Sequence, residues 1–252
     1  MAFTPSLDQR LVAHRGWQQR YPENTLIGIQ AALNAGACHI EIDVHLTADH
    51  VPVLCHDLTL ERLSGSSGTI TELTLQQLQD YSAYEPDRLG GRYRGNPFTT
   101  LQQCVTLLQR YSGVSLYVEI KRKSLYHFGA RKMLEAVLPL LQTLRDRSFL
   151  ISFDVPVLAS ARLRGWKNIA PVLTTLEQAR SEEFQRLQPD MLFCDTDLLS
   201  AAGAVQGLGW PVAVYEVDSA ESAQYWFKQG VALVETFKVG QLINDLRAGD
   251  DG

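Results

Sequence analysis

Residues 11–57 of the chain contain two histidines that are each followed directly by a charged residue. His14 precedes Arg15, and His56 precedes Asp57. Histidine titrates near neutral pH, so a pair of histidines can accept one proton and donate another in one reaction. Either histidine alone would be interpreted as a hydrogen-bonded core residue, but together they predict a general acid and base. The remaining histidines are interpreted as core or surface residues: His39, His45, His50 and His127.

Three carboxylates lie on the polar faces of two predicted strands. Glu41 and Asp43 alternate with apolar residues in residues 38–46, and Glu119 does the same in residues 115–121. Side chains two apart on a strand point the same way, so these carboxylates are expected to face a shared interior. Converging carboxylates repel one another unless a cation lies among them, and oxygen ligands suit Mg²⁺ or Ca²⁺. A salt-bridge network would explain a single carboxylate; three favour a divalent metal site.

Two basic residues accompany these acids. Arg15 follows His14, and Lys121 follows Glu119 by two positions. Arginine can bind a phosphate through two parallel hydrogen bonds, whereas lysine acts as a point charge. A metal, two cations and an acid/base pair suit phosphoryl transfer, in which spread negative charge must be stabilised. The net charge of −5 argues against nucleic acid as a partner, so a small phosphodiester is the expected substrate.

The elements that must position these residues alternate between strand and helix. This alternation predicts a parallel sheet with right-handed crossovers. Eight such strands are expected, containing Leu11, Ile40, Leu116, Phe149, Ile169, Met191, Val212 and Val231. Helices are expected near residues 26–33, 101–108, 128–144, 155–163, 176–187, 198–208, 220–229 and 240–247, the first capped by Asn24 or Thr25.

Eight strands predict an α/β fold of the (β/α)₈ TIM barrel class. An open doubly wound sheet is the structural alternative. In both folds chemistry occurs at the carboxyl ends of the strands, where the candidate residues fall. Residues 51–55 would form a short extra segment at the rim.

One region departs from the alternation. Residues 58–98 hold few apolar side chains and several glycines, with one short helix expected at 75–80 behind a Thr74/Gln77 capping box. This region is interpreted as a small insertion after the second strand, or a lid over the site, because it cannot build its own core. We therefore predict one domain over residues 1–252.

Composition indicates a globular protein with an ample core, with 45% hydrophobic and 20% charged residues. The four cysteines show no paired spacing, which favours reduced thiols, and no Cys/His spacing indicates zinc. No basic and apolar leader begins the chain, and no apolar run approaches the ~20 residues of a membrane span. A cytoplasmic location without stable membrane insertion is the resulting expectation.

Short motifs in the first half resemble those of the glycerophosphodiester phosphodiesterase family. The matching stretches are His14-Arg15-Gly16, Pro22-Glu23-Asn24-Thr25, Glu41-Ile42-Asp43, Thr47-Ala48-Asp49, Pro52-Val53, His56-Asp57 and Glu119-Ile120-Lys121. The resemblance implies a TIM-type barrel that hydrolyses glycerophosphodiesters, such as glycerophosphocholine or glycerophosphoethanolamine, to sn-glycerol 3-phosphate and an alcohol. It also implies that His14 and His56 are the acid/base pair. By the same resemblance, three residues bind the metal (Glu41, Asp43 and Glu119) and two bind the phosphate (Arg15 and Lys121).

The second half departs from the family pattern at two strand ends. Tyr215-Glu216-Val217-Asp218 stands where the family often has Trp-Thr-Val-Asn, and Glu235-Thr236-Phe237-Lys238 stands where it often has Thr-Asp and proline. Four residues are therefore predicted to line an altered substrate pocket: Tyr215, Glu216, Glu235 and Phe237. The alternative is that Glu216 and Glu235 form ordinary salt bridges at the rim.

Several readings of function stay open at this point. The nucleophile could be water or the glycerol hydroxyl of the substrate, which would give a cyclic phosphate. A phospholipase acting on intact or lyso lipids is a second enzyme reading. A non-catalytic phosphate-metabolite binding protein is the alternative of another class.

Overall fold

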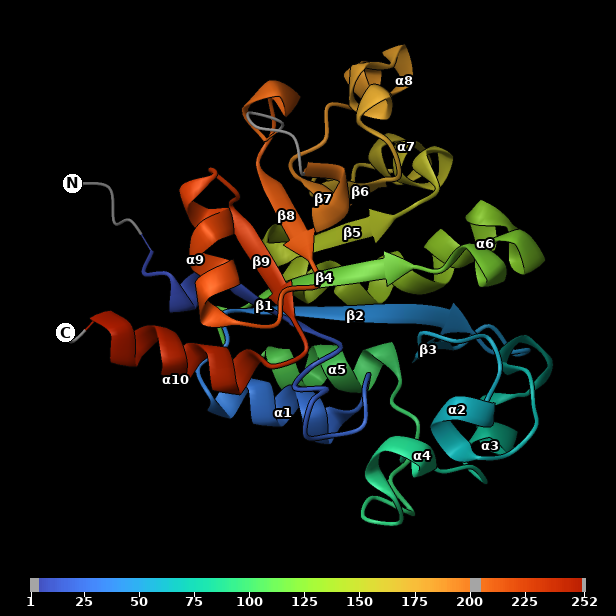
Figure 1. Ribbon diagram of the computed structural model, residues 1–252. Coiled ribbons are helices and arrows are strands. Elements are labelled where there is room, and N and C mark those ends of the chain that lie inside the picture. The colour runs from blue at the N-terminus through green and yellow to red at the C-terminus, as the bar shows by residue number, and fades with distance from the viewer. Residues whose placement is uncertain (1–4, 200–204, 251–252) are drawn as a thin grey trace.

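The computed structural model describes residues 5–199 and 205–250. Eight strands form a closed parallel barrel because β1 pairs with both β2 and β9 (Figure 1). The short β3 is the exception and runs antiparallel to β2. The strands are β1 (Leu11–His14), β2 (His39–Leu46), β3 (Pro52–Leu54), β4 (Ser115–Ile120), β5 (Ser148–Ser152), β6 (Ile169–Leu173), β7 (Leu192–Asp195), β8 (Val212–Tyr215) and β9 (Leu233–Thr236). The predicted (β/α)₈ TIM barrel is confirmed.

Helices pack around the outside of this barrel (Figure 1). They are α1 (Leu26–Asn34), α2 (Glu61–Ser64), α3 (Leu75–Leu78), α4 (Pro86–Leu89), α5 (Leu101–Leu108), α6 (Arg122–Leu141), α7 (Val155–Leu163), α8 (Glu182–Leu187), α9 (Ala220–Lys228) and α10 (Val239–Asp250). None of those in the described ranges is long and apolar enough to cross a bilayer. In Figure 1, α2, α3 and α4 lie to one side of the barrel, in the inserted region.

Three helix predictions need correction. Helix α6 begins at Arg122, not near residue 128, because a kink at Gly129 (φ 83°) joins two helical segments. The helix predicted over 176–187 is a 3₁₀ turn, Leu176–Arg180, followed by α8 from Glu182. The helix predicted near 198–208 falls partly on residues 200–204, outside the described residues, and 3₁₀ turns flank that gap.

Strand alternation divides the core into two layers. Ile40, Ile42 and Val44 of β2 face outward and pack beneath the helices. The opposite face of the barrel strands fills the interior with Val12, Tyr117, Ile151, Ala170, Val172, Phe193, Ala213 and Leu233. Glu41 and Asp43 lie on this inner face, above the apolar filling, as the period-two pattern predicted.

Strand register places the polar residues side by side. His14 pairs with Glu41 across β1 and β2, and Asp43 pairs with Glu119 across β2 and β4. Paired residues of neighbouring parallel strands lie on the same face of the sheet, so these four side chains meet at the carboxyl-end mouth.

The inserted region, residues 58–98, contains α2, α3 and α4. Its apolar side chains, including Leu60, Leu63 and Ile70, form one cluster with Val53 of β3 and Phe98. This cluster is separate from the two layers of the barrel core, but Val53 lies on β3, which pairs with β2. The insertion therefore packs on a strand of the barrel sheet, which supports the proposal that the chain forms one domain.

Candidate active site

A cavity of about 190 Å³ opens at the carboxyl ends of the barrel strands. It brings together residues from all eight barrel strands and from segments that follow them. Its lining consists of His14, Arg15, Glu41, His56, Glu119, Lys121, Ile151, Phe153, Val172, Phe193, Tyr215, Glu216 and Glu235. Nearly all predicted site residues therefore meet in one place, although Phe153 and Phe193 were not predicted there.

The loop after β1 is held in an unusual backbone conformation. Arg15 (φ 58°) and Gly16 (φ 82°) both adopt left-handed geometry. A Cβ atom on Gly16 would lie 2.8 Å from the carbonyl carbon of Gly28, so only glycine fits. This turn lets the Arg15 N–H donate to Glu41 Oε2 at 3.2 Å and directs the guanidinium toward Asp43.

Glu41, Asp43 and Glu119 form the predicted carboxylate cluster. One oxygen from each lies within 4.8 Å of the others. Burial, together with the charge of Asp43, raises the pKa of both Glu41 and Glu119. Burial would also raise the pKa of Asp43, but Arg15 and Lys121 hold it below its usual range. Three hard oxygen donors that repel one another are a suitable ligand set for Mg²⁺ or Ca²⁺.

His14 lies between the carboxylates and the end of β9. Its ring stacks on Phe237 with a centroid separation of 4.4 Å. Nε2 is 3.8 Å from Glu41 Oε2, while the buried Nδ1 has no hydrogen-bond partner within the described part of the chain. Burial and the neighbouring Arg15 charge lower the pKa of His14 well below its usual value. His14 is therefore neutral at neutral pH and able to accept a proton.

A chain of alternating charges links His56 to the carboxylate cluster. His56 Nδ1 donates to Asp57 Oδ1 at 2.8 Å, which leaves Nε2 of that ring free. Arg62 of α2 connects Asp57 to the buried Glu23 with N–O distances of 2.6 Å to each. The hydrogen bond from His56, followed by Arg62, holds the pKa of Asp57 below its usual range.

The chain of charges continues through Arg15 to Lys121. Glu23 Oε2 is 3.3 Å from Arg15, whose Nε lies 3.0 Å from Asp43 Oδ2. Lys121 Nζ completes the series, 3.1 Å from Asp43 Oδ1 and 3.0 Å from Glu119 Oε1. The salt-bridge network considered as an alternative to a metal site is thus present, and it pairs Asp43 and Glu119 with basic side chains. Among the described residues, Glu41 lies 3.8 Å from His14 but forms an ion pair with no lysine or arginine.

Asn24 is a positioning residue that sequence patterns did not reveal. Its side-chain amide donates to Asp43 Oδ2 at 2.8 Å and accepts from the Asp43 N–H at 3.1 Å. The predicted cap role belongs to Thr25, whose hydroxyl accepts from the Gly28 N–H. Glu23 and Arg62 were also missed, although Glu23 and Asn24 stand within the matching motif at residues 22–25.

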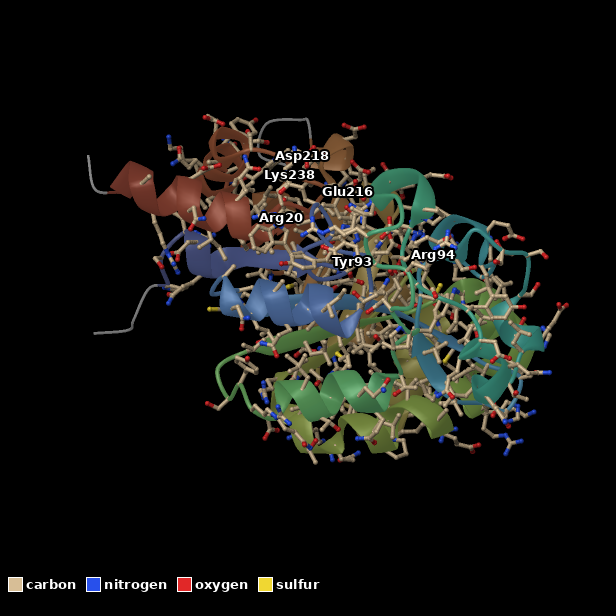
Figure 2. The ribbon with its side chains drawn as sticks, turned by 90° about the horizontal axis from the view of Figure 1, so that it is seen from below. Arg20, Tyr93, Arg94, Glu216, Asp218 and Lys238 are labelled. Carbon is tan, nitrogen blue, oxygen red and sulfur yellow. The ribbon has the colours of Figure 1, made fainter. Side chains whose placement is uncertain are left out.

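The atypical strand ends contribute acidic groups to this cavity. Glu235 of β9 is buried, and its Oε1 atom has no partner among the described residues. Burial raises the pKa of Glu235 well above its usual value. Glu216 Oε1 is 3.8 Å from His14 Nδ1. Glu216 lies beside Asp218 and Lys238 in Figure 2, and Asp218 forms an ion pair with Lys238 at 3.3 Å on the rim of the barrel. Glu216 therefore faces His14 and has no basic rim partner of its own in the described chain.

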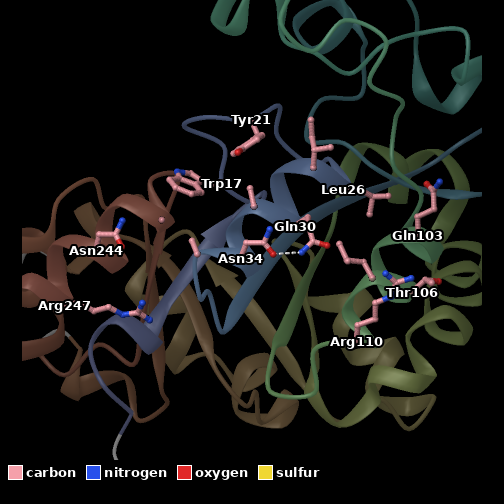
Figure 3. Close-up of a pocket in the computed structure, with 15 residues that line it drawn as sticks. Trp17, Tyr21, Leu26, Gln30, Asn34, Gln103, Thr106, Arg110, Asn244 and Arg247 are labelled. Atoms are coloured by element: carbon pink, nitrogen blue, oxygen red, sulfur yellow. Dashed lines mark hydrogen bonds between the residues drawn. The ribbon is translucent and has the colours of Figure 1, made fainter.

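A larger cavity, about 1010 Å³, lies on the outer wall between α1, α5 and α10 (Figure 3). Its labelled polar residues include Gln30 and Asn34, which hydrogen-bond to each other. It contains no histidine or carboxylate and none of the predicted site residues. Size alone does not make it the chemical site.

A (β/α)₈ barrel with paired histidines and converging carboxylates at its carboxyl-end mouth has the organisation of a barrel enzyme. The sequence profile of the glycerophosphoryl diester phosphodiesterase family matches residues 14–236. The chain belongs to this family.

Curated relatives and solved structures carry related names. Mouse glycerophosphodiester phosphodiesterase 1 is 34% identical over 110 residues, which cover 44% of this chain and 33% of the mouse protein. A probable glycerophosphodiester phosphodiesterase 1 of Mycobacterium tuberculosis is 33% identical over 66% of this chain and 62% of its own length. The match thus spans a third to under two thirds of these relatives.

Similar solved structures cover the whole barrel. An Oleispira antarctica phosphodiesterase, solved with the product sn-glycerol-3-phosphate, has a TM-score of 0.83 and 22% identity over 100% of this chain and 98% of its own. A putative glycerophosphoryl diester phosphodiesterase of Silicibacter pomeroyi has a TM-score of 0.80 and 22% identity over 96% and 95%. At this identity the structural likeness shows the fold.

Proposed function

We propose that the chain hydrolyses glycerophosphodiesters to sn-glycerol 3-phosphate and an alcohol in a reaction that depends on a divalent metal. One observation carries the proposal: His14 and His56 line the same cavity as Glu41, Glu119 and Lys121. Membership of the family and the names of its relatives support this substrate class.

Glu41, Asp43 and Glu119 would hold Mg²⁺ or Ca²⁺. The bound ion would neutralise charge on the phosphate oxygens. Arg15 and Lys121 are held at the same place by Asp43 and would bind the phosphate. Three residues of the atypical strand ends would contact or position the substrate: Tyr215 and Glu235, which line the cavity, and Phe237, which supports His14.

The two histidines would divide the proton transfers. Neutral His14 takes the proton of the attacking hydroxyl while the new P–O bond forms. The P–O bond to the alcohol then breaks, and its electron pair leaves with the alkoxide, which takes a proton from His56. Asp57 stabilises the protonated ring through the bond at Nδ1. The attacking hydroxyl is that of water or of the substrate's own glycerol.

We also propose a cytoplasmic location, because all four cysteines are free. Reduced thiols are typical of proteins in reducing compartments.

Release of glycerol 3-phosphate from glycerophosphocholine tests the function. Chelation should abolish the release, and Mg²⁺ or Ca²⁺ should restore it. His14→Ala and His56→Ala should each lower the rate on the order of 10²–10⁴-fold. His127→Ala, on the exposed face of α6, is the matched control.

Other outcomes identify the alternatives. Full turnover by either active-site variant would contradict the acid/base assignment. Turnover confined to lipid micelles would indicate a phospholipase, and binding without turnover would indicate a metabolite-binding protein. Hydrolysis in ¹⁸O-labelled water, with analysis for a cyclic phosphate, separates the two nucleophiles.

A further inference from the structure

A second cavity of about 290 Å³ adjoins the first at His56, which lines both. The two cavities share His56, Glu119, Lys121 and Phe153. A phosphodiester has two arms on one phosphate, so a phosphate held beside His56 would extend one arm into each cavity. Only the first cavity contains His14, and the second lies next to the proposed proton donor. The second cavity is therefore placed to receive the alcohol that leaves.

The lining of the second cavity is basic, unlike that of the first. Arg122 and Lys123 join Lys121 there, whereas its two carboxylates, Asp57 and Glu119, are already paired with basic side chains. By contrast, acidic residues outnumber basic ones in the first cavity, where four glutamates accompany Arg15 and Lys121.

Arg122 and Lys123 occupy the first turn of α6, which contains no acidic residue. The N-terminus of a helix carries partial positive charge, so two cations there weaken the helix instead of stabilising it. The same arrangement favours binding of an anion, because the free N–H groups of a first helical turn and nearby basic side chains both attract negative charge. Arg122 also lies 5.1 Å from the centre of the Phe153 ring, which holds the guanidinium near the shared wall.

His45 supplies an independent sign of a ligand. It lines the second cavity, is 1% exposed, and lies 3.3 Å through Nε2 from the His56 carbonyl. Because a carbonyl only accepts, Nε2 carries the hydrogen and Nδ1 is the acceptor of the ring. This Nδ1 is buried and unpartnered within the described residues. A hydroxyl group of a ligand would satisfy it.

We propose that the second cavity binds the alcohol arm of the diester and selects alcohols that carry both a hydroxyl group and a negative charge, such as a phosphorylated polyol. The hydroxyl donates to His45 Nδ1, and the anion lies against Arg122, Lys123 and the start of α6. This inference rests on the proposed function and narrows its substrate class.

Competing substrates test the selection. The ratio of kcat/KM for glycerophosphoinositol 4-phosphate to that for glycerophosphocholine should exceed 10 in the native protein. The double variant Arg122→Gln/Lys123→Gln should lower this ratio by about tenfold, the effect of losing a charge-assisted hydrogen bond. The matched control, Arg131→Gln/Lys132→Gln, removes the same charges from an exposed part of α6 and should keep the ratio. A native ratio near one, or equal ratios in the two double variants, would overturn the proposal.

His45 is tested by a pair of variants. His45→Leu removes the acceptor and should raise KM for glycerophosphoinositol about tenfold, while KM for glycerophosphocholine, whose alcohol has no further hydroxyl, changes less. His45→Gln can still donate and accept, so it should recover part of the loss. An equal KM change for both diesters would refute the role of Nδ1.

A direct binding measurement separates this inference from the proposed function. If no diester is hydrolysed, the proposed function fails, but calorimetric binding of inositol 4-phosphate still tests the second cavity. Binding that is lost in Arg122→Gln/Lys123→Gln and kept in Arg131→Gln/Lys132→Gln would support the site. Equal binding by both variants, or none by the native protein, would refute it.

Discussion

Replacement of Asn24 by alanine should destabilise the protein although Asn24 is not one of the proposed catalytic residues. The side chain of Asn24 makes two hydrogen bonds to Asp43, one to the backbone N–H and one to the carboxylate. Both residues are 1% exposed, so water cannot replace the lost partner. On its other side, the Asp43 carbonyl already accepts from the Cys55 N–H at 3.0 Å.

The size of this effect follows from three contributions. A buried N–H left without an acceptor costs about 1–3 kcal/mol. The carboxylate keeps Arg15 and Lys121 but loses one neutral donor, which costs about 1 kcal/mol more. Asn24 also has a left-handed backbone (φ 54°), where alanine is less favourable by about 1 kcal/mol. Together these effects predict a loss of about 3–5 kcal/mol in the free energy of unfolding.

Urea unfolding of the metal-free protein measures this loss directly. Asn34→Ala is the matched control, because Asn34 is exposed near the end of α1 and, among the described residues, its side chain bonds only to Gln30. This control should change stability by less than about 0.5 kcal/mol. Since Asp43 is a proposed metal ligand, Asn24→Ala should also weaken Mg²⁺ binding roughly 10–100-fold. A stability loss below about 1 kcal/mol for Asn24→Ala would refute the reasoning.

Three further predictions concern the same mouth of the barrel. Gly16→Ala places a Cβ atom on a left-handed backbone and against Gly28, and should lower the free energy of unfolding by about 2 kcal/mol or more. Gly113→Ala is the control and should change it little, because a Cβ atom there meets open space. Comparable unfolding midpoints for the two variants would contradict this prediction. Phe237→Ala removes the ring on which His14 stacks and should lower kcat about tenfold, with a smaller change in KM. A change confined to KM would show that Phe237 only binds substrate. Burial and the charge of Asp43 raise the pKa of Glu41, so below that pKa a metal ion must displace the Glu41 proton to bind. Mg²⁺ affinity should therefore rise with pH up to the pKa of Glu41. Calorimetry in two buffers of different protonation enthalpy should detect the released proton.

The sequence alone predicts the barrel and the carboxylate cluster for the same reason. Period-two alternation gives each strand an inner and an outer face, so Glu41 and Asp43 are separated from Ile42 without any knowledge of partners. Parallel strands end at one mouth, which brings Glu119 to the same place from a distant part of the chain. Both conclusions need only local periodicity and one rule of fold geometry.

Asn24, Glu23 and Arg62 could not be placed in this way. Each acts through a partner on another element: Asn24 reaches Asp43 on β2, and Glu23 meets Arg62 on α2. The position of Asn24 just before a helix made it a candidate helix cap, because an asparagine side chain can cap a helix as well as hold a distant carboxylate. The weak apolar pattern of residues 58–98 gave no orientation for Arg62, since short helices with few core contacts are positioned by their polar bonds.

Those polar bonds change how the inserted region should be understood. Arg62 lies on α2 of the insertion, yet its guanidinium contacts both Asp57, the partner of His56, and Glu23, the partner of Arg15. A lid that opens freely would break these ion pairs and leave Arg15 as the one basic partner of the buried Glu23 carboxylate among the described residues. Water screens part of this loss because the Arg62 side chain is 41% exposed, but the buried Glu23 carboxylate would still lose a basic partner, so these ion pairs oppose opening. The first turn of the insertion therefore acts as part of the wall that fixes His56 and Arg15 relative to each other.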